Sequence, residues 1–261
     1  MTDDALLAFV RRHDPDRFLT ALFAPPGRRG ALLVLYAFNH ELARAREVTT
    51  EPGLALIRLH WWREVVAGTR RRHEVATPLG AALDAGALHP PDLLAMIDAR
   101  EAEAEPSLPT RAAWEAYVRG AAGTLAVAAG RALGAGTTLL PRLSDLGTTY
   151  GVAGQLRSVG FFARYGRCLL PEDLLAAHGF SPPGVMANPA APGLRPVLAE
   201  LAGWGRMLLR RSGGKLPRPV LAAGLPAVLA RRDLGRLGTP PGPRGLGDRL
   251  AVMAAAAVGR V

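Results

Sequence analysis

Apolar residues recur at helical spacing along most of this chain, in segments that proline and glycine separate. One such segment covers residues 28–47, RRGALLVLYAFNHELARARE. Positions three and four residues apart fall on one face of a helix, so this spacing predicts an amphipathic helix of several turns. The residues expected near one face of that helix are Leu32, Leu35, Tyr36, Asn39, Ala43 and Glu47.

Further helices are predicted on both sides of this segment. Two short amphipathic segments precede it and stop at Pro25, and later segments begin near Pro52 and Pro90, as helices often do at proline. Residues 110–135 and 140–166 are each rich in small side chains, so we expect two closely packed helices at the buried centre. The expected connections, rich in proline and glycine, run from Ser181 to Gly193 and over residues 237–247.

The composition supports a helical fold. Hydrophobic residues make up 49% of the 261 positions, with abundant alanine and leucine and few aromatic residues, at 6%. This balance favours helices over sheets. No shift in composition marks a second domain, so we expect residues 1–261 to form a single all-α domain.

A formal net charge of +10 raises the question of an anionic partner. The chain has 32 basic residues, and Lys215 is the only lysine among them. Such a surplus draws a protein toward anionic membranes or acidic ligands, but a genomic bias in composition gives arginine without lysine as well. Zinc-finger spacing, a basic heptad region and an aromatic-rich strand are all missing from the sequence, so no nucleic-acid partner is expected.

Features that locate a protein in the cell are few. Arginines interrupt the most apolar stretches before they reach the roughly 18–20 residues that cross a bilayer, and the first residues are acidic rather than basic. A single cysteine, Cys168, allows no internal disulfide and suits a reducing compartment. We therefore expect a cytoplasmic protein, with peripheral contact at the inner face of the membrane left open.

Three stretches, in order, resemble squalene and phytoene synthases. Residues 16–47 are similar to the N-terminal part of these enzymes, where an LYAF helix carries a DDxxD-type motif. Residues 117–134 resemble the small-residue helix behind the active-site cavity, and residues 155–175, QLRSVGFFARYGRCLLPEDLL, resemble the second acidic signature. The resemblance implies an isoprenoid-synthase-type helical domain around a central cavity, with the helices that carry Ala43 and Ser158 facing each other.

The acids of the family are mostly missing from the matching positions. In these enzymes facing carboxylates hold Mg²⁺, which neutralises the leaving diphosphate of a prenyl substrate. The first motif falls on Ala43, Arg44 and Glu47, and the second falls on Ser158 and Phe162, so only Glu47 keeps an acid. The resemblance therefore implies no catalytic residue, no metal ligand and no cofactor.

A divergent branch of the family shares these departures. Its members replace the first motif by FN-x-EL, as Asn39, Glu41 and Leu42 do here, and the second by LR and a small residue. This branch includes a mitochondrial assembly factor for respiratory complex I. The resemblance implies a non-catalytic role in assembling NADH:ubiquinone oxidoreductase, with complex I subunits or assembly factors as partners.

Two alternatives stay open. An active head-to-head prenyltransferase would need magnesium and other acids, such as Asp98, Glu101 and Glu105, although that charge run is typical of a solvated helical face. A metal-free binder would hold an isoprenoid diphosphate or an anionic lipid by arginine. The candidate ligand-binding residues are Asn39, Arg44, Glu47, Arg157, Ser158, Arg164 and Arg167.

In the binding alternative, Arg44 and Arg157 are expected near the two helical walls that carry the metal-binding acids in the enzymes. The competing interpretation is that Arg44 pairs with Glu41 or Glu47 within its own helix, because side chains three or four residues apart are neighbours there. Two tryptophans, Trp61 and Trp62, either line a lipid pocket or pack in the core.

Overall fold

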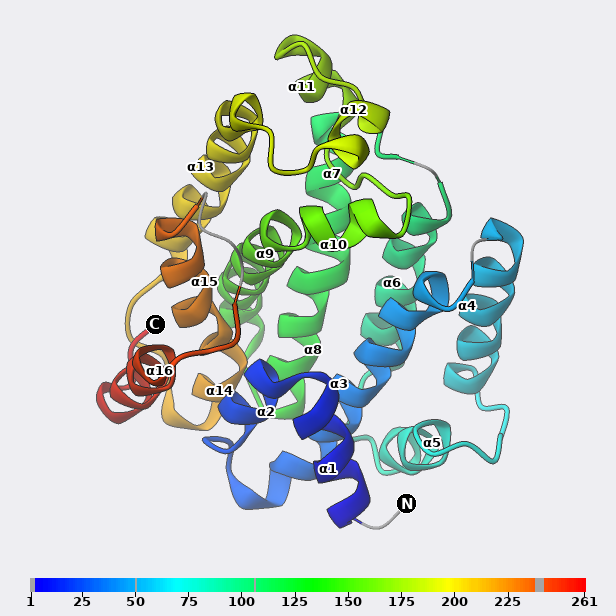
Figure 1. Ribbon diagram of the computed structural model, residues 1–261. Coiled ribbons are helices and arrows are strands. Elements are labelled where there is room, and N and C mark those ends of the chain that lie inside the picture. The colour runs from blue at the N-terminus through cyan, green and yellow to red at the C-terminus, as the bar shows by residue number, and fades with distance from the viewer. Residues whose placement is uncertain (1–2, 50, 106, 238–241) are drawn as a thin grey trace.

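The computed structural model describes residues 3–49, 51–105, 107–237 and 242–261, and these ranges are mainly helical (Figure 1). Within them no strand forms, and β-type pairing is limited to isolated bridges that join Leu108 to Pro171 and Lys215 to Arg260. The predicted all-α fold class is therefore confirmed.

The α-helices in chain order are α1 (Asp3–His13), α2 (Pro15–Ala21), α3 (Pro26–Glu47), α4 (Pro52–Val66), α5 (Ala76–Asp84), α6 (Pro90–Glu101), α7 (Arg111–Val118), α8 (Thr124–Ala132), α9 (Leu140–Arg157), α10 (Val159–Arg164), α11 (Glu172–Ala177), α12 (Pro182–Ala187), α13 (Arg195–Ser212), α14 (Leu221–Gly224), α15 (Pro226–Gly235) and α16 (Leu246–Val258). Short 3₁₀ turns connect several of them. Figure 1 shows α8 and α9 in the middle, with α4 and α5 on one side and α13, α15 and α16 on the other.

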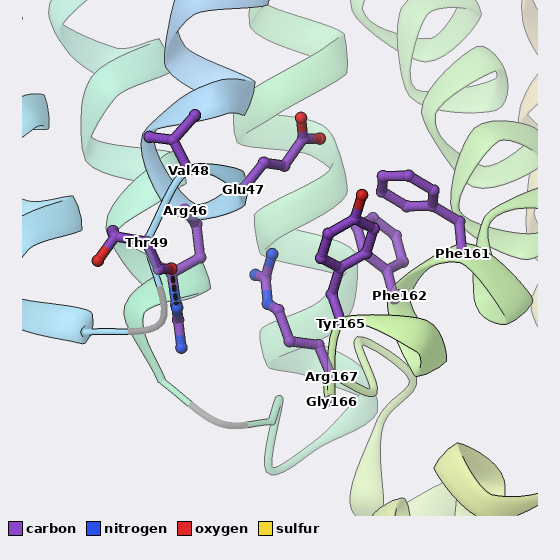
Figure 2. A pocket seen from close by; sticks show the side chains of 9 residues that line it. All are labelled: Arg46, Glu47, Val48, Thr49, Phe161, Phe162, Tyr165, Gly166 and Arg167. Carbon is purple, nitrogen blue, oxygen red and sulfur yellow. Dashed lines mark hydrogen bonds between the residues drawn. The ribbon is translucent and has the colours of Figure 1, made fainter.

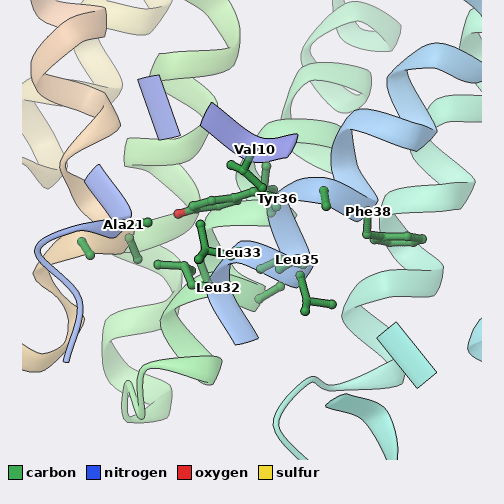
Figure 3. Close-up of a cluster of buried hydrophobic side chains, with 14 of the residues drawn as sticks. Val10, Ala21, Leu32, Leu33, Leu35, Tyr36 and Phe38 are labelled. Carbon is green, nitrogen blue, oxygen red and sulfur yellow. The ribbon is translucent and has the colours of Figure 1, made fainter. Parts of the chain in front are cut away.

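Helix α3 runs through the main hydrophobic core rather than along its edge. Residues 32–39 are all buried, because α3 packs against α1, α2, α4, α5, α6 and α8. Figure 3 shows Leu32, Leu35 and Phe38 within this cluster. A helix enclosed on every side is apolar all round in its middle part. The sequence predicts a single buried face on this helix, and the buried surface found is wider than that. Trp62, 3% exposed, packs edge-to-face on Phe38, which places it in the core.

The buried centre is formed by the two small-residue segments, as predicted. Residues 111–132 are one helical rod, α7 and α8, joined by a π-helical turn over Arg119–Gly123. Glycines allow this rod to lie directly on α9: a Cβ atom at Gly147 would be 2.4 Å from the Cβ of Ala126, and one at Gly123 would be 2.6 Å from Oγ1 of Thr148. These contacts are closer than any side chain permits, so glycine is required there.

Two expected features of the chain path differ from the structure. The segment 140–166 is broken at Ser158, which leaves the helical region (φ −94°, ψ 4°) between α9 and α10. The connection expected from Ser181 to Gly193 contains α12, because Ser181 caps the Gly184 N–H and prolines occupy the first turn. Of the connection expected over 237–247, residues 238–241 lie outside the described part of the chain. None of the described helices combines the length and the hydropathy that crossing a bilayer requires.

Candidate functional site

A cavity of about 160 Å³ lies between α2, α3, α6, α9 and the π-helical turn. Asn39 of α3 and Ser158 at the end of α9 both line it, together with Arg100, Tyr117 and Tyr150. The prediction that α3 and α9 face each other across a cavity is therefore confirmed. This cavity is small for a prenyl chain, because ligand pockets usually measure about 300–1,000 Å³.

A buried ionic cluster closes one side of the cavity. Glu103 follows α6 in a 3₁₀ turn; it is 4% exposed and forms an ion pair with Arg100. Its Oε1 atom accepts a 2.7 Å hydrogen bond from the Tyr117 hydroxyl, which in turn accepts one of 3.2 Å from Gln155 Nε2. Burial and the Glu103 carboxylate raise the pKa of Tyr117, so the phenol keeps its proton. The negative charge of Glu103 is thus paired with Arg100 inside the cluster.

A second cation, Arg17 of α2, also lines the central cavity. It forms a 2.9 Å ion pair with Asp14 and lies 4.7 Å from the centre of the Tyr150 ring. The Tyr150 hydroxyl donates a 2.9 Å hydrogen bond to Asp16. Each arginine that lines the cavity therefore has a carboxylate partner from the chain itself.

The positions that match the metal-binding acids do not fit Mg²⁺. Ala43 and Phe162 have no oxygen ligand in their side chains, and Arg44 Nη1 lies 3.1 Å from Oε1 of Glu41 on the same helix. Desolvation and the neighbouring Glu103 raise the pKa of Glu47, which makes this carboxyl a poorer ligand for a cation. Among the residues that the structure describes, no three His, Cys, Asp or Glu side chains are grouped to hold a metal ion.

A larger pocket, of about 710 Å³, opens where the C-terminal end of α3 meets α10 (Figure 2). Arg46 and Arg167 supply its cations, and Phe161, Phe162 and Tyr165 supply an aromatic wall. Figure 2 shows Arg167 extending from below α10 toward the end of α3. Arg167 is 6% exposed, and its Nε atom has no hydrogen-bond partner within the described ranges. Fixed cations beside aromatic rings can hold an anionic group that carries an apolar tail.

Arg46 and Arg167 are held differently in this pocket. Arg46 Nη1 donates a 2.6 Å hydrogen bond to the Thr49 carbonyl, and its buried Nε has no partner among the residues described. Arg167 Nη2 donates a 3.1 Å hydrogen bond to the backbone carbonyl of Glu103 and lies 3.6 Å from its carboxylate. Arg167 therefore joins the pocket to the ionic cluster of the central cavity.

The structure divides the predicted site residues between the central cavity, the α3–α10 pocket and positions outside both. Asn39 and Ser158 line the central cavity, whereas Glu47 and Arg167 line the α3–α10 pocket. The remaining three, Arg44, Arg157 and Arg164, line neither.

The three outlying arginines face other neighbours. Arg44 lines a surface pocket with His13 and His40, Arg157 donates a 3.0 Å hydrogen bond to Asp233 of α15, and Arg164 is exposed. Neither Arg44 nor Arg157 therefore lines the central cavity that α3 and α9 enclose. The competing interpretation, in which Arg44 pairs with Glu41, is confirmed.

Glu103, beside the central cavity, and Arg46, in the α3–α10 pocket, were not identified as site residues from the sequence. Glu103 lies in the acidic run interpreted as a solvated face, and Asp98 and Glu101 of that run are indeed exposed and pair with Arg63. The 3₁₀ turn after Glu101 rotates Glu103 inward, a change that helical spacing does not reveal. Arg46 was a detectable candidate, since it precedes Glu47 at the end of α3.

Sequence comparisons relate this chain to one protein family and to several known proteins. A family model for squalene/phytoene synthase matches residues 10–252. The human protein "NADH dehydrogenase (ubiquinone) complex I, assembly factor 6" is 23% identical over 217 residues, which cover 81% of this chain and 65% of that protein. Its counterpart from Mus musculus is 24% identical over 229 residues, with 85% and 68% coverage. The chain thus spans about two thirds of the length of these relatives.

Solved structures show the same fold. A dehydrosqualene synthase in complex with ligand superposes with a TM-score of 0.77 at 14% identity, over 98% of this chain and 95% of that one. The squalene synthase HpnC from Alicyclobacillus acidocaldarius gives 0.67 at 19% identity, over 98% and 94%. At such identities the likeness shows the fold alone, but the family model covers nearly the whole sequence. The chain therefore belongs to the squalene/phytoene synthase family.

Proposed function

We propose that this protein assists the assembly of respiratory complex I, NADH:ubiquinone oxidoreductase, and that it does so without prenyl transfer. Complex I subunits or other assembly factors are its partners under this proposal. The similarity to proteins named as complex I assembly factors supports the role. It acts in the cytoplasm, in peripheral contact with the inner face of the membrane.

One observation carries the non-catalytic half of the proposal. The matching positions on α3 and α9–α10 hold Ala43, Arg44, Ser158 and Phe162, whose side chains do not suit Mg²⁺. Prenyl synthases of this family need that ion to stabilise the leaving diphosphate, since its charge would otherwise develop without compensation. The self-paired arginines of the central cavity support the same conclusion, because each already has an acid beside it.

Gene deletion in the organism that makes this chain tests the proposal. We expect the deletion to lower the amount of assembled complex I on native gels and the NADH:ubiquinone oxidoreductase activity of membranes, while succinate-driven respiration is unchanged. Re-expression of the chain should restore both readouts. Normal complex I together with the loss of a prenyl product would instead establish the enzymatic alternative.

A second candidate function rests on the α3–α10 pocket. We propose that this pocket binds the phosphate group of an isoprenoid diphosphate or of an anionic lipid directly, without a metal. The buried Arg167, with its unpartnered Nε, and the neighbouring Arg46 support this proposal. The aromatic wall of Phe161, Phe162 and Tyr165 suits the apolar part of such a ligand. Binding of this kind is compatible with the assembly role.

A further inference from the structure

The last helix, α16, presents an apolar face to the outside. Leu246, Leu250, Met253 and Val258 are 74%, 52%, 53% and 65% exposed. They recur at spacings of three to five residues, and Ala254 and Ala257 are exposed between them, so together they form one continuous stripe along the helix. Arg249 is the one charged residue exposed on α16. Figure 1 shows α16 at the edge of the molecule, beside α15.

The opposite side of α16 is fixed to the body of the protein. Val252 and Ala256 are buried in the main core, and Asp248 is 4% exposed. The Asp248 carboxylate pairs with Arg232 of α15 at 2.5 Å and with Arg236 at 3.0 Å. The apolar stripe of α16 therefore faces away from the body of the protein.

The C-terminal end of α16 is also fixed. Arg218 donates hydrogen bonds of 2.6 and 2.7 Å to the carbonyls of Ala256 and Ala257, which a helix otherwise leaves without partners. The isolated bridge between Lys215 and Arg260 holds the following residues against the Gly213–Gly214 turn. Three exposed basic residues, Lys215, Arg218 and Arg260, are thereby gathered at this end of the helix.

The charge of the protein is concentrated in the part of the chain that carries this helix. Residues 201–261 contain eleven basic and two acidic residues, a net charge of +9, whereas residues 1–200 carry only +1. Both acids are neutralised within the fold, because Asp233 pairs with Arg157 and Arg244, and Asp248 pairs as described above. An apolar stripe therefore lies within the most basic part of the chain.

We propose that the α16 face, the stripe from Leu246 to Val258 with its surrounding arginines, docks the protein onto an anionic phospholipid membrane. Leucine and methionine side chains would enter the boundary between headgroups and acyl chains, while Arg249 and the basic residues at the C-terminal end pair with lipid phosphates. A helix of 13 residues is too short to span a bilayer but suits the plane of its surface.

Charge and the apolar stripe together favour an anionic membrane over a second copy of the chain and over nucleic acid. A second copy of the chain would bring the exposed basic residues of this face, Arg249 and the three at the C-terminal end of α16, toward their own copies, and like charges oppose such pairing. Nucleic acid would satisfy the arginines but would leave the leucine and methionine side chains in water. An anionic membrane satisfies both the charge and the apolar stripe.

The proposed membrane contact of the assembly factor thereby gains a defined surface, and in that respect the inference rests on the proposed function. The two fail separately, because vesicle binding is measured with the purified chain and complex I assembly is measured in cells. If the purified chain bound vesicles but its deletion did not affect complex I, the proposal for the α16 face would stand and the proposed assembly role would be wrong.

Vesicle co-sedimentation of the purified full chain tests the proposal. We expect binding to vesicles of equal parts phosphatidylcholine and phosphatidylglycerol, weaker binding at high salt, and little binding to phosphatidylcholine alone. The double substitution Leu250→Ser with Met253→Ser should lower the affinity at least about tenfold, since each removes apolar area that enters the membrane. Leu54→Ser, at a 51% exposed leucine of α4, is the matched control and should bind normally.

Three results would overturn the proposal. The first is absence of binding to the anionic vesicles, and the second is binding that the double substitution leaves unchanged, which would show charge attraction without insertion. The third is a dimer in light scattering that the double substitution converts to monomer, because the stripe would then be an interface between copies. Unchanged thermal unfolding of each variant shows that a loss of binding is not a loss of fold.

Discussion

The Tyr117 hydroxyl lies 2.7 Å from Oε1 of Glu103, inside the protein and fourteen residues away along the chain. This hydrogen bond places the acid between two largely buried arginines, Arg100 and Arg167, which both pair with it. Glu103 is thus the common counter-charge of the central cavity and the α3–α10 pocket.

Replacement of Glu103 by glutamine should therefore destabilise the protein strongly. Two buried guanidinium groups would lose their anion, and breaking a buried pair in this way costs about 3–5 kcal/mol. Urea denaturation measures the change in the free energy of unfolding. Glu101→Gln is the control: Glu101 is 48% exposed in its pair with Arg63, so its loss should cost less than about 1 kcal/mol. Equal effects of the two substitutions would contradict the assigned role of Glu103.

Two glycines of α9 should respond in opposite directions to alanine. A Cβ atom at Gly147 would lie 2.4 Å from the Cβ of Ala126 and 2.5 Å from the carbonyl oxygen of Ala122, so Gly147→Ala must push α8 and α9 apart. We expect a loss of about 1–3 kcal/mol, as for other overpacked cores. Among the described residues no atom lies within 4 Å of such a Cβ at Gly154, and Gly154→Ala should stabilise the helix by about 0.5–1 kcal/mol. Thermal unfolding of both variants gives the comparison.

Incubation with Mg²⁺ and farnesyl or geranylgeranyl diphosphate should give no squalene, presqualene or phytoene product. Ala43, Arg44, Ser158 and Phe162 stand where the ion would need carboxylates, so the diphosphate has no metal-assisted route of departure. Product analysis by mass spectrometry is the measurement, with an active squalene synthase as the positive control. Turnover that is abolished by replacing Glu47 or Glu101 would show that other acids hold the metal.

Metal-free binding of a prenyl diphosphate should depend on Arg46. We expect a titration with a non-hydrolysable farnesyl diphosphate analogue in EDTA to show binding, and Arg46→Ala to weaken it by about 1–3 kcal/mol, as for hydrogen bonds to charged groups. Arg44→Gln keeps a donor for Glu41 outside this pocket and serves as the control. If only the Arg44 variant lost affinity, the site would lie beside α1 instead of at α10.

The stability of the protein should fall in acid partly through Asp248. Although burial favours the neutral acid, hydrogen bonds from Arg232 and Arg236 lower the pKa of Asp248 from 3.8 to about 2. The unfolded chain thus takes up a proton first, so this contribution is complete above about pH 4 and is lost as the pH falls toward 2. Asp248→Asn should be about 1–3 kcal/mol less stable than the natural protein at pH 7.

Urea denaturation at pH 7, 4 and 3 tests this assignment. The difference in unfolding free energy between the natural protein and Asp248→Asn should shrink below pH 4, because the natural carboxylate is then being protonated in the unfolded chain. A difference that stayed constant over this range would mean that another acid, such as the buried Asp145, accounts for the acid sensitivity.

Local sequence patterns determined the helices and the contacts within them. Proline marks the beginnings of α3, α4 and α6, and the small residues of 110–135 and 140–166 predict the close packing found at Gly123 and Gly147. The pair between Glu41 and Arg44 was also predictable, because residues three apart on a helix are neighbours whatever the rest of the fold does. The missing acids at the metal positions follow from the sequence in the same way.

Only the tertiary structure decided where the long side chains point and which surfaces stay uncovered. Arg157 turns to Asp233, 76 residues later, and Glu103 turns inward to Tyr117 through a single 3₁₀ turn. The apolar face of α16 is exposed because α15 and the core occupy its other side. Spacing along one helix fixes which residues share a face, but the neighbours that pack against the helix decide whether that face is core or surface.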